Sequence, residues 1–196
     1  MSLPTTAPAR MLRPALLLAG IFLLAANMRG ALTVIEERAP VILAEYRENL
    51  RSRINEILAD KDTPKGIMFL MDVDHFKSIN DTFGHDVGDR VIYQLGSFLG
   101  KRFVDDEIAG RFGGDEFIVF IKDTDDQDVA RNIAEDIISG AASNITLPDE
   151  NKKVSVSIGI AIYNGAEKNY SEIFKKADTA LYRSKADPEN RVCVFK

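Results

Sequence analysis

The order of strand-like and helix-like segments after residue 66 predicts an α+β fold, with a ferredoxin-like, palm-type sheet built on a βαββαβ core. Three observations support this prediction. A short apolar run, IMFLMDV, is typical of a buried strand, two further strands are joined through Gly113-Gly114, and VSVSIGIAIY alternates like a long strand. We expect helices on one face of this sheet and a helical segment before it.

Each element of this domain follows from local composition and spacing. Apolar and β-branched runs predict strands at residues 67–73, 108–112, 117–121, 154–163 and 191–195. Apolar residues at helical spacing predict helices at residues 87–103, 128–139 and 171–185. The buried faces of the first and last helix are expected to consist of Val91, Leu95, Phe98 and Leu99, and of Ile173, Ala177, Ala180 and Leu181.

The chain divides into three parts by composition: an apolar segment (1–35), an amphipathic helix with a linker (36–65), and a globular domain (66–196). The uninterrupted apolar run, residues 15–26, is shorter than the ~20 residues that span a bilayer. Extending the run to residue 35 includes Arg29, which is costly in a membrane. Residues 11–33 weakly resemble the first helix of a major-facilitator transporter of the cyanate-permease type. Two interpretations stay open for residues 14–35: membrane association, and a fusion remnant.

Residues 36–60 show a four-residue apolar repeat, formed by Ile42, Tyr46, Leu50, Ile54 and Leu58. This spacing predicts an amphipathic helix. The helix either packs on the following domain or forms a dimerising stalk.

The bulk composition excludes some classes of protein. A net charge of −5 argues against a dedicated nucleic-acid binder, although it leaves room for a nucleotide bound through metal ions. A single cysteine, Cys193, excludes an internal disulfide and a multi-cysteine zinc site. Its place in an alternating apolar run predicts a packed strand residue.

Acidic residues follow the predicted strands at two places. Asp72 and Asp74 lie at the end of the first strand, and Asp115 and Glu116 follow the glycine pair of the hairpin. Any one of these residues alone would be expected to be a solvated turn residue. Together, and with neighbouring strands, they predict a cluster of carboxylate oxygens that favours Mg²⁺ or Mn²⁺ and phosphoryl transfer.

The segment between these strands, residues 74–89, concentrates polar groups and glycines. We expect a loop that leads into helices and offers N–H groups and Lys77 to phosphates. Asn80 and Asp89 could read a purine edge, because a carboxylate accepts hydrogen bonds from guanine and not from adenine in that arrangement. Ordinary helix caps are the alternative for both, and a structural hydrogen bond is the alternative for His85.

Four blocks in a fixed order carry a resemblance to a known family. They are residues 110–117 (GRFGGDEF), 72–89 (DVDHFKSINDTFGHDVGD), 156–161 (VSIGIA) and 177–185 (ADTALYRSK). On these blocks, residues 66–196 resemble GGDEF domains, the diguanylate cyclases that make cyclic di-GMP from two GTP.

The resemblance implies roles for the matching positions. Metal ligands would be Asp72, the Val73 carbonyl, Asp115 and Glu116. Catalytic residues would be Asp115, Glu116 and Lys77, with Asp115 helping to deprotonate the ribose 3′-hydroxyl and Lys77 stabilising transition-state charge. Substrate-binding residues would be the backbone near Phe76, and Asn80, His85, Asp89 and Lys185. It also implies GTP as substrate, cyclic di-GMP as product, Mg²⁺ or Mn²⁺, a catalytic homodimer, and a cytoplasmic domain that the N-terminal segment could anchor to the inner membrane.

Three departures from the family pattern bear on activity. The opening Asp-x-Leu-Thr-Gly-Leu-x-Asn-Arg block has its nearest candidate at residues 32–38, without the glycine and asparagine. Glu189 stands where a phosphate-binding cation is expected. The inhibitory Arg-x-x-Asp positions are Val104 and Glu107, and Arg102 lies two residues too early, which predicts little product inhibition.

These observations leave three hypotheses for the chain. The first is an active diguanylate cyclase, favoured by the intact Gly-Gly-Asp-Glu-Phe sequence. The second is a weak or inactive GGDEF module that binds GTP or cyclic di-GMP, favoured by the departures. The third is a membrane-attached interaction protein, favoured only by the N-terminal segments.

Overall fold

The structure, a computed structural model, describes residues 47–60, 65–104, 107–167, 169–187 and 189–196. Its centre is a five-stranded sheet in the order β2-β3-β1-β4-β5. The strands are β1 (Gly66–Val73), β2 (Ile108–Gly113), β3 (Glu116–Lys122), β4 (Val156–Tyr163) and β5 (Val192–Val194). The central strand β1 pairs antiparallel with β3 and β4, and β5 pairs parallel with β4. The predicted α+β class and sheet are therefore confirmed.

Four labelled helices connect the strands: α3 (Phe76–Phe83), α4 (His85–Arg102), α5 (Gln127–Asn144) and α6 (Tyr170–Lys185). A further helix precedes β1 at residues 47–59. The predicted inward residues are buried at Val91, Leu95 and Leu99 of α4, and at Ile173, Ala177, Ala180 and Leu181 of α6. Phe98, the fourth predicted on α4, is only partly buried and packs against the same core.

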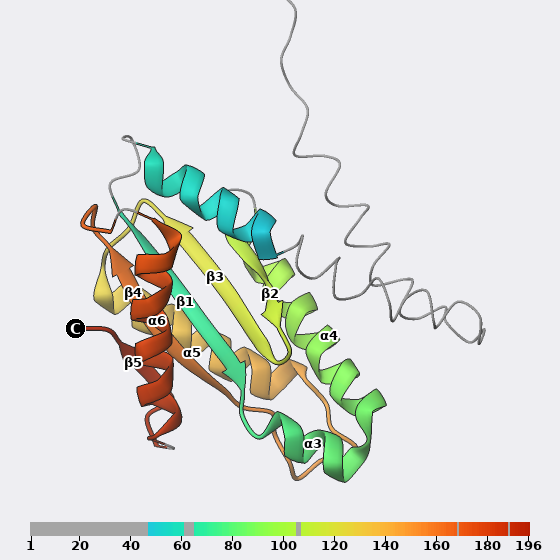
Figure 1. The fold of residues 1–196 in the computed structure, drawn as a ribbon. Coiled ribbons are helices and arrows are strands. Elements are labelled where there is room, and N and C mark those ends of the chain that lie inside the picture. Colours follow the sequence, from blue (N-terminus) through green and yellow to red (C-terminus); the bar gives the residue numbers. More distant parts are fainter. Residues whose placement is uncertain (1–46, 61–64, 105–106, 168, 188) are drawn as a thin grey trace, which may run out of the picture. The chain divides into compact units, whose positions relative to one another are not determined.

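Helices cover both faces of the sheet, and the expectation of one covered face was wrong. Every residue of β1 is buried, so its alternating side chains form two apolar surfaces. Phe69 and Met71 pack with α4 and α5, whereas Met68 and Leu70 pack with α6 and helix 47–59. Figure 1 shows α6 in front of the sheet and α5 behind it. The continuous apolar run IMFLM requires cover on both sides, which a one-sided arrangement would leave exposed.

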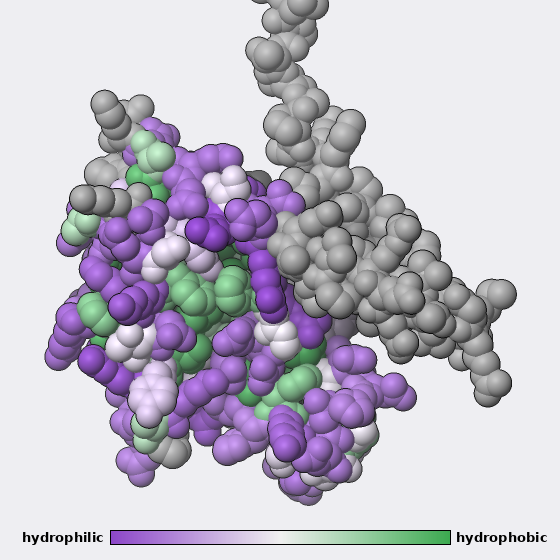
Figure 2. All heavy atoms as spheres, in the orientation of Figure 1, coloured by the Kyte–Doolittle hydropathy of each residue, from purple (hydrophilic) through white to green (hydrophobic). Residues whose placement is uncertain are grey.

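The helix at residues 47–59 contributes three buried side chains, Leu50, Ile54 and Leu58, to the core on the α6 side. Of the two alternatives for the amphipathic segment, packing on the following domain is therefore the one observed for residues 47–59. Figure 2 shows that the side carrying this helix and α6 is mostly hydrophilic, with apolar atoms gathered between them. Residues 1–46, which include the apolar segment, its transporter-like stretch and the start of the suggested stalk, lie outside the described residues.

Two boundaries differ from the sequence prediction for identifiable reasons. The expected loop at residues 74–89 is mostly helix, because Phe76, Ile79 and Phe83 place one apolar stripe of α3 on the core. Helix α5 continues past residue 139, the end predicted from the sequence, to Asn144. A Cβ at Gly140 would lie 2.7 Å from Phe98 Cε2, so this glycine admits the phenylalanine ring rather than ending the helix.

Candidate active site

The alternation of the strands places polar side chains in a row across one end of the sheet. In β1 the even-numbered residues face α6, and the last of them is Asp72, which is only 8% exposed. Asp72 pairs in register with Glu116 of β3 on one side and with Ser157 of β4 on the other. At this end of the sheet, the apolar surface under α6 thus gives way to a row of three polar side chains, Glu116, Asp72 and Ser157.

The turn between β2 and β3 holds Asp115 beside this row. Gly114 adopts a left-handed conformation with φ 53°, which glycine accepts without steric cost. The Val73 N–H donates to the Asp115 carbonyl at 3.2 Å, and Arg111 Nε donates to the Gly114 carbonyl at 2.9 Å. The turn is therefore tied both to the end of β1 and to its own strand.

Burial and neighbouring negative charge both act on the carboxylates of Asp72 and Glu116. Burial raises the pKa of Asp72 above its ordinary value, and the charge of Asp115 adds to this, while a hydrogen bond from Lys185 opposes it. Burial also raises the pKa of Glu116, and the charges of Asp72 and Asp115 act in the same direction. Negative charge is thus concentrated at this end of the sheet beyond what the protein alone neutralises.

Lys185, at the end of α6, is the cation nearest to Asp72, with Nζ 2.8 Å from Oδ2. Close packing of α6 on β4 sets its position. A Cβ at Gly159 would lie 2.7 Å from the Cα of Leu181, so the backbones approach where glycine has no side chain. Lys185, which the resemblance predicts to contact the triphosphate, therefore lies beside Asp72 in the fold.

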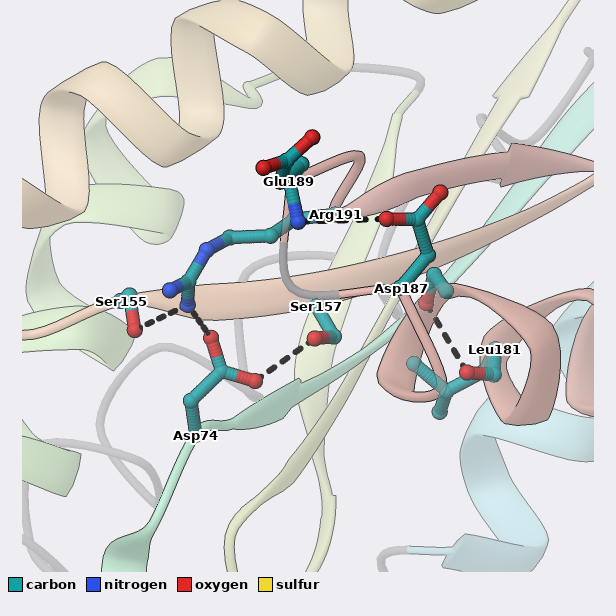
Figure 3. Close-up of polar contacts among 8 residues, drawn as sticks. Asp74, Ser155, Ser157, Leu181, Asp187, Glu189 and Arg191 are labelled. Carbon is teal, nitrogen blue, oxygen red and sulfur yellow. Dashed lines mark hydrogen bonds and ion pairs between the residues drawn. The ribbon is translucent and has the colours of Figure 1, made fainter.

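Asp74 has a different environment from Asp72. One carboxylate oxygen accepts a hydrogen bond from Ser157 Oγ at 2.6 Å, and the other pairs with the Arg191 guanidinium, which also contacts Ser155 Oγ. Figure 3 shows Asp74 held between Arg191 and Ser157. This carboxylate is committed to Ser157 and Arg191, so it fixes the cavity wall, whereas Asp72 has Lys185 as its cationic partner.

A cavity of about 250 Å³ opens at this place. Acidic and cationic side chains line this cavity together, and the cations are Lys185 and Arg191. Its lining also includes Asp72, Asp74, His75 and Ser157. Glu189 is exposed, and its N–H donates to Asp187 Oδ1 at 3.2 Å. Glu189, the acid that stands where the family has a cation, thus lies at the surface. Arg191 is the cation of this segment that reaches the cavity.

A second polar group lies where α3 meets α4. The Asn80 side chain lies against Gly88, where a Cβ would be 2.9 Å from Asn80 Cγ and 3.2 Å from the Phe76 ring. Asn80 Oδ1 is buried and has no hydrogen-bond partner among the described residues. Asp89 follows Gly88 and is exposed. Since α3 ends at residue 83 and α4 begins at residue 85, the Asn80 side chain of α3 lies against α4 one residue before Asp89.

Comparison with known proteins decides the family. The sequence model described as "Diguanylate cyclase, GGDEF domain" matches residues 44–191. The chain belongs to the GGDEF family. The match begins before β1 and takes in helix 47–59, while nothing in the comparisons supports a transporter-like N-terminus.

Relatives and solved structures agree with this assignment. The chain is 38% identical over 137 residues to the probable diguanylate cyclase DgcT of Escherichia coli, covering 67% of this chain and 29% of that protein. It is 37% identical over 126 residues to the response regulator PleD of Caulobacter vibrioides, covering 63% and 28%. The chain spans about a third of the length of such curated relatives.

Two solved structures show the same fold. The GGDEF domain of DgcB from Caulobacter crescentus, in complex with c-di-GMP, aligns with a TM-score of 0.65 at 29% identity, covering 76% of this chain and 87% of that one. The active GGEEF domain of a diguanylate cyclase from Vibrio cholerae aligns with a TM-score of 0.66 at 28% identity, covering 76% and 93%.

The remaining predicted residues of the GGDEF domain lie on α3 and α4. Lys77 is exposed in the first turn of α3, directly after Phe76, and His85 is the exposed first residue of α4. Arg102 at the end of α4 is 3.8 Å from Asp136, and Val104 is exposed. Residue 105, the acid of the shifted inhibitory motif, lies outside the described residues.

Sequence reasoning had given no role to three residues of this site: Arg111, Ser157 and Arg191. Burial lowers the pKa of Arg111, and the charges of Asp89 and Asp115 oppose that shift, so Arg111 lies within electrostatic reach of both polar groups. The signal for Ser157 was present in the sequence, because it is a polar residue within an alternating strand. Arg191 gave no local signal, since its partner lies 117 residues away.

Proposed function

We propose that this GGDEF domain condenses two GTP molecules into cyclic di-GMP and pyrophosphate. The observation that carries the proposal is the row formed by Asp72 and Glu116, with Asp115 close enough to influence both charges, beside a cavity that is lined by Asp72, Lys185 and Arg191. Acidic oxygens next to cations are suited to a metal-bound triphosphate. Family membership supplies the reaction type for these groups.

The donor set fits Mg²⁺ or Mn²⁺, because carboxylate oxygens are the ligands that these ions prefer. Among the described residues, no group of three or more His, Cys, Asp or Glu side chains forms a metal site by itself. Asp72, Glu116, Asp115 and the Val73 carbonyl would therefore share the ion with the phosphates of GTP. When bound, the metal would polarise the phosphoryl group and stabilise the charged carboxylates of Asp72 and Glu116, whose pKa values burial and neighbouring negative charge raise.

The chain's own groups would bind and orient the nucleotide. Lys185 lies beside Asp72 and would hold the triphosphate, and Lys77 on α3 would stabilise charge on the transferring phosphoryl group. Asp115 would accept the proton of the ribose 3′-hydroxyl. This division assigns phosphate binding to the ends of α6 and α3, and proton transfer to the hairpin.

Guanine would bind where α3 meets α4. Asn80 Oδ1 is a buried acceptor without a partner among the described residues, and Asp89 is a nearby carboxylate. Guanine presents N–H donors to such acceptors, with His85 at the start of α4 supporting the pocket. The alternative of simple capping is weakened, since α3 and α4 have no side-chain cap hydrogen bond.

The product joins two nucleotides symmetrically, so two GTP-loaded domains would have to face each other. A homodimer follows from this chemistry, with one GTP per subunit. Specific activity should therefore fall when the protein is diluted below the dimer dissociation constant.

A weak or inactive module remains the second candidate. Glu189 supports it, because an acid replaces the expected phosphate-binding cation. A GTP-binding domain without turnover would fit that change.

One experiment separates the two candidates. The purified chain is incubated with GTP and Mg²⁺, and cyclic di-GMP is measured by mass spectrometry, with ATP and a chelator as negative controls. Cyclic di-GMP from GTP alone supports the cyclase, and calorimetric GTP binding without product supports the module. A matched Asp115→Asn variant should bind GTP and make no product.

A further inference from the structure

Arg47, the first described residue of helix 47–59, reaches the motif hairpin across 65 residues of sequence. Its Nε donates to the Phe112 carbonyl, and its Cζ lies 5.4 Å from the centre of the Phe112 ring. Arg47 therefore makes two contacts with Phe112: a cation–π contact with the ring and a hydrogen bond to the backbone carbonyl. Both contacts come from an element outside the Gly-Gly-Asp-Glu-Phe sequence.

The same guanidinium occupies the space that a side chain at residue 113 would take. A Cβ at Gly113 would lie 2.7 Å from Arg47 Cζ, and its three nearest heavy atoms would all belong to Arg47. The φ of Gly113 is not left-handed, so its backbone conformation does not require glycine. Gly114 is the opposite case, with φ 53° and open space around it. The first glycine thus makes room for Arg47, and the second permits the turn.

Three hydrogen bonds from different elements fix this turn. Val73 at the end of β1 donates to Asp115, Arg111 donates to Gly114, and Arg47 donates to Phe112. The first two come from the sheet itself. The third comes from a helix whose buried residues are Leu50, Ile54 and Leu58, so the position of that helix on the sheet determines where Arg47 stands.

We propose that Arg47 is a positioning residue that couples helix 47–59 to the hairpin carrying Asp115 and Glu116. It touches neither nucleotide nor metal in this scheme. It holds the end of β2, which leads into the turn with Asp115 and into Glu116 of β3, and a displacement of the acids by about 1 Å would lower the rate about 10²-fold. The kinetic part of this inference rests on the proposed cyclase function, whereas the structural part does not.

The test compares Arg47→Ala and Arg47→Lys with Arg53→Ala, an exposed arginine of the same helix. In Arg47→Ala we expect kcat to fall about 10- to 100-fold with little change in KM for GTP. Amide hydrogen exchange of residues 113–116 should accelerate about five- to tenfold, the factor expected for one lost hydrogen bond, at an unchanged thermal midpoint. Arg47→Lys should restore part of both, and Arg53→Ala should match the wild type.

Gly113→Ala gives an independent arm, because its methyl group would displace the guanidinium. Alone, it should accelerate hairpin exchange as much as Arg47→Ala does. In the Arg47→Ala background it should add little, since the space is then free. Additive effects, or exchange at the wild-type rate in Arg47→Ala, would overturn the inference.

The two proposals fail in different ways. A wild-type protein that makes no cyclic di-GMP contradicts the cyclase, while the exchange measurements still decide on Arg47. An active wild type with unchanged turnover and exchange in Arg47→Ala contradicts the coupling alone.

Discussion

The two faces of the central strand use the same backbone for different purposes. On the α4 and α5 side, Phe69, Met71 and Val73 continue the apolar core to the end of β1. On the α6 side, Met68 and Leu70 are apolar, but the next position is Asp72. Packing of the apolar side chains on the α4 and α5 face of β1 therefore fixes the position of Asp72 on the α6 face. The comparison predicts that stability and activity should separate by face.

The largest effect is expected on the apolar face. Phe69 is fully buried, so Phe69→Ala removes a large packed side chain and leaves a cavity. The free energy of unfolding should fall by about 3–5 kcal/mol, as measured by urea denaturation. Cyclic di-GMP formation should be lost only in proportion to unfolded protein. A variant that keeps wild-type stability would contradict the two-faced core.

Asp72→Asn should produce the opposite pattern. Removal of this charge is expected to lower turnover at least about 10²-fold, because the metal loses a ligand. Stability should not fall, since burial disfavours the charged form of Asp72. Mg²⁺ should raise the thermal midpoint of the wild type and not that of the variant.

Asp74→Asn is the matched comparison, because this carboxylate pairs with Arg191. It should destabilise the protein by leaving the guanidinium without its charged partner. If Asp74→Asn and Asp72→Asn gave the same losses, the distinction between the two acids would be wrong.

A smaller effect is expected at the pocket between α3 and α4. Asp89→Ala should weaken GTP binding by about 1–3 kcal/mol, seen as a raised Michaelis constant and poorer discrimination against ATP. The fold should be unaffected, because Asp89 is exposed. Unchanged affinity and base selectivity would remove Asp89 from the guanine pocket.

The smallest effect concerns the pH dependence of stability without metal. The pKa values of Asp72 and Glu116 are raised in the folded protein, so the native state holds more protons than the unfolded chain just above the ordinary carboxylate pKa. Stability should therefore fall as pH rises from the unfolded pKa through the raised folded pKa. Asp72→Asn should flatten this part of the curve in chemical denaturation at successive pH values. An equally steep curve in the variant would show that Asp72 does not contribute.

Local patterns predicted much of this fold, and contacts between distant segments account for most of what they missed. Strand β1 was expected at residues 67–73 and begins one residue earlier, at Gly66. The prediction was close because apolar runs mark buried strands directly. The second helical layer was missed, since a continuous apolar run does not reveal which elements cover its two faces. Helix α3 is too short, with eight residues, for a clear period.

The site shows the same division between local and distant information. Asp72, Glu116 and Lys185 were named from motifs and lie together in the structure. The roles of Arg47 and Arg191 depend on partners 65 and 117 residues away, which only the folded topology brings near. Whether each named residue binds or reacts stays a prediction for the variants above.

The glycine beneath α6 has a mechanical consequence for the triphosphate site. Gly159 lets the helix rest on β4 near Leu181, and Lys185 lies four residues farther on, about 6 Å along the helix axis. A rigid helix that tilts about such a contact moves its free end in proportion to that distance. Any side chain at residue 159 would meet main-chain atoms that cannot turn aside, so it would lift the helix and carry the ammonium group away from Asp72. The distance between the Lys185 ammonium group and Asp72 thus depends on the absence of a side chain at residue 159 in the sheet below α6.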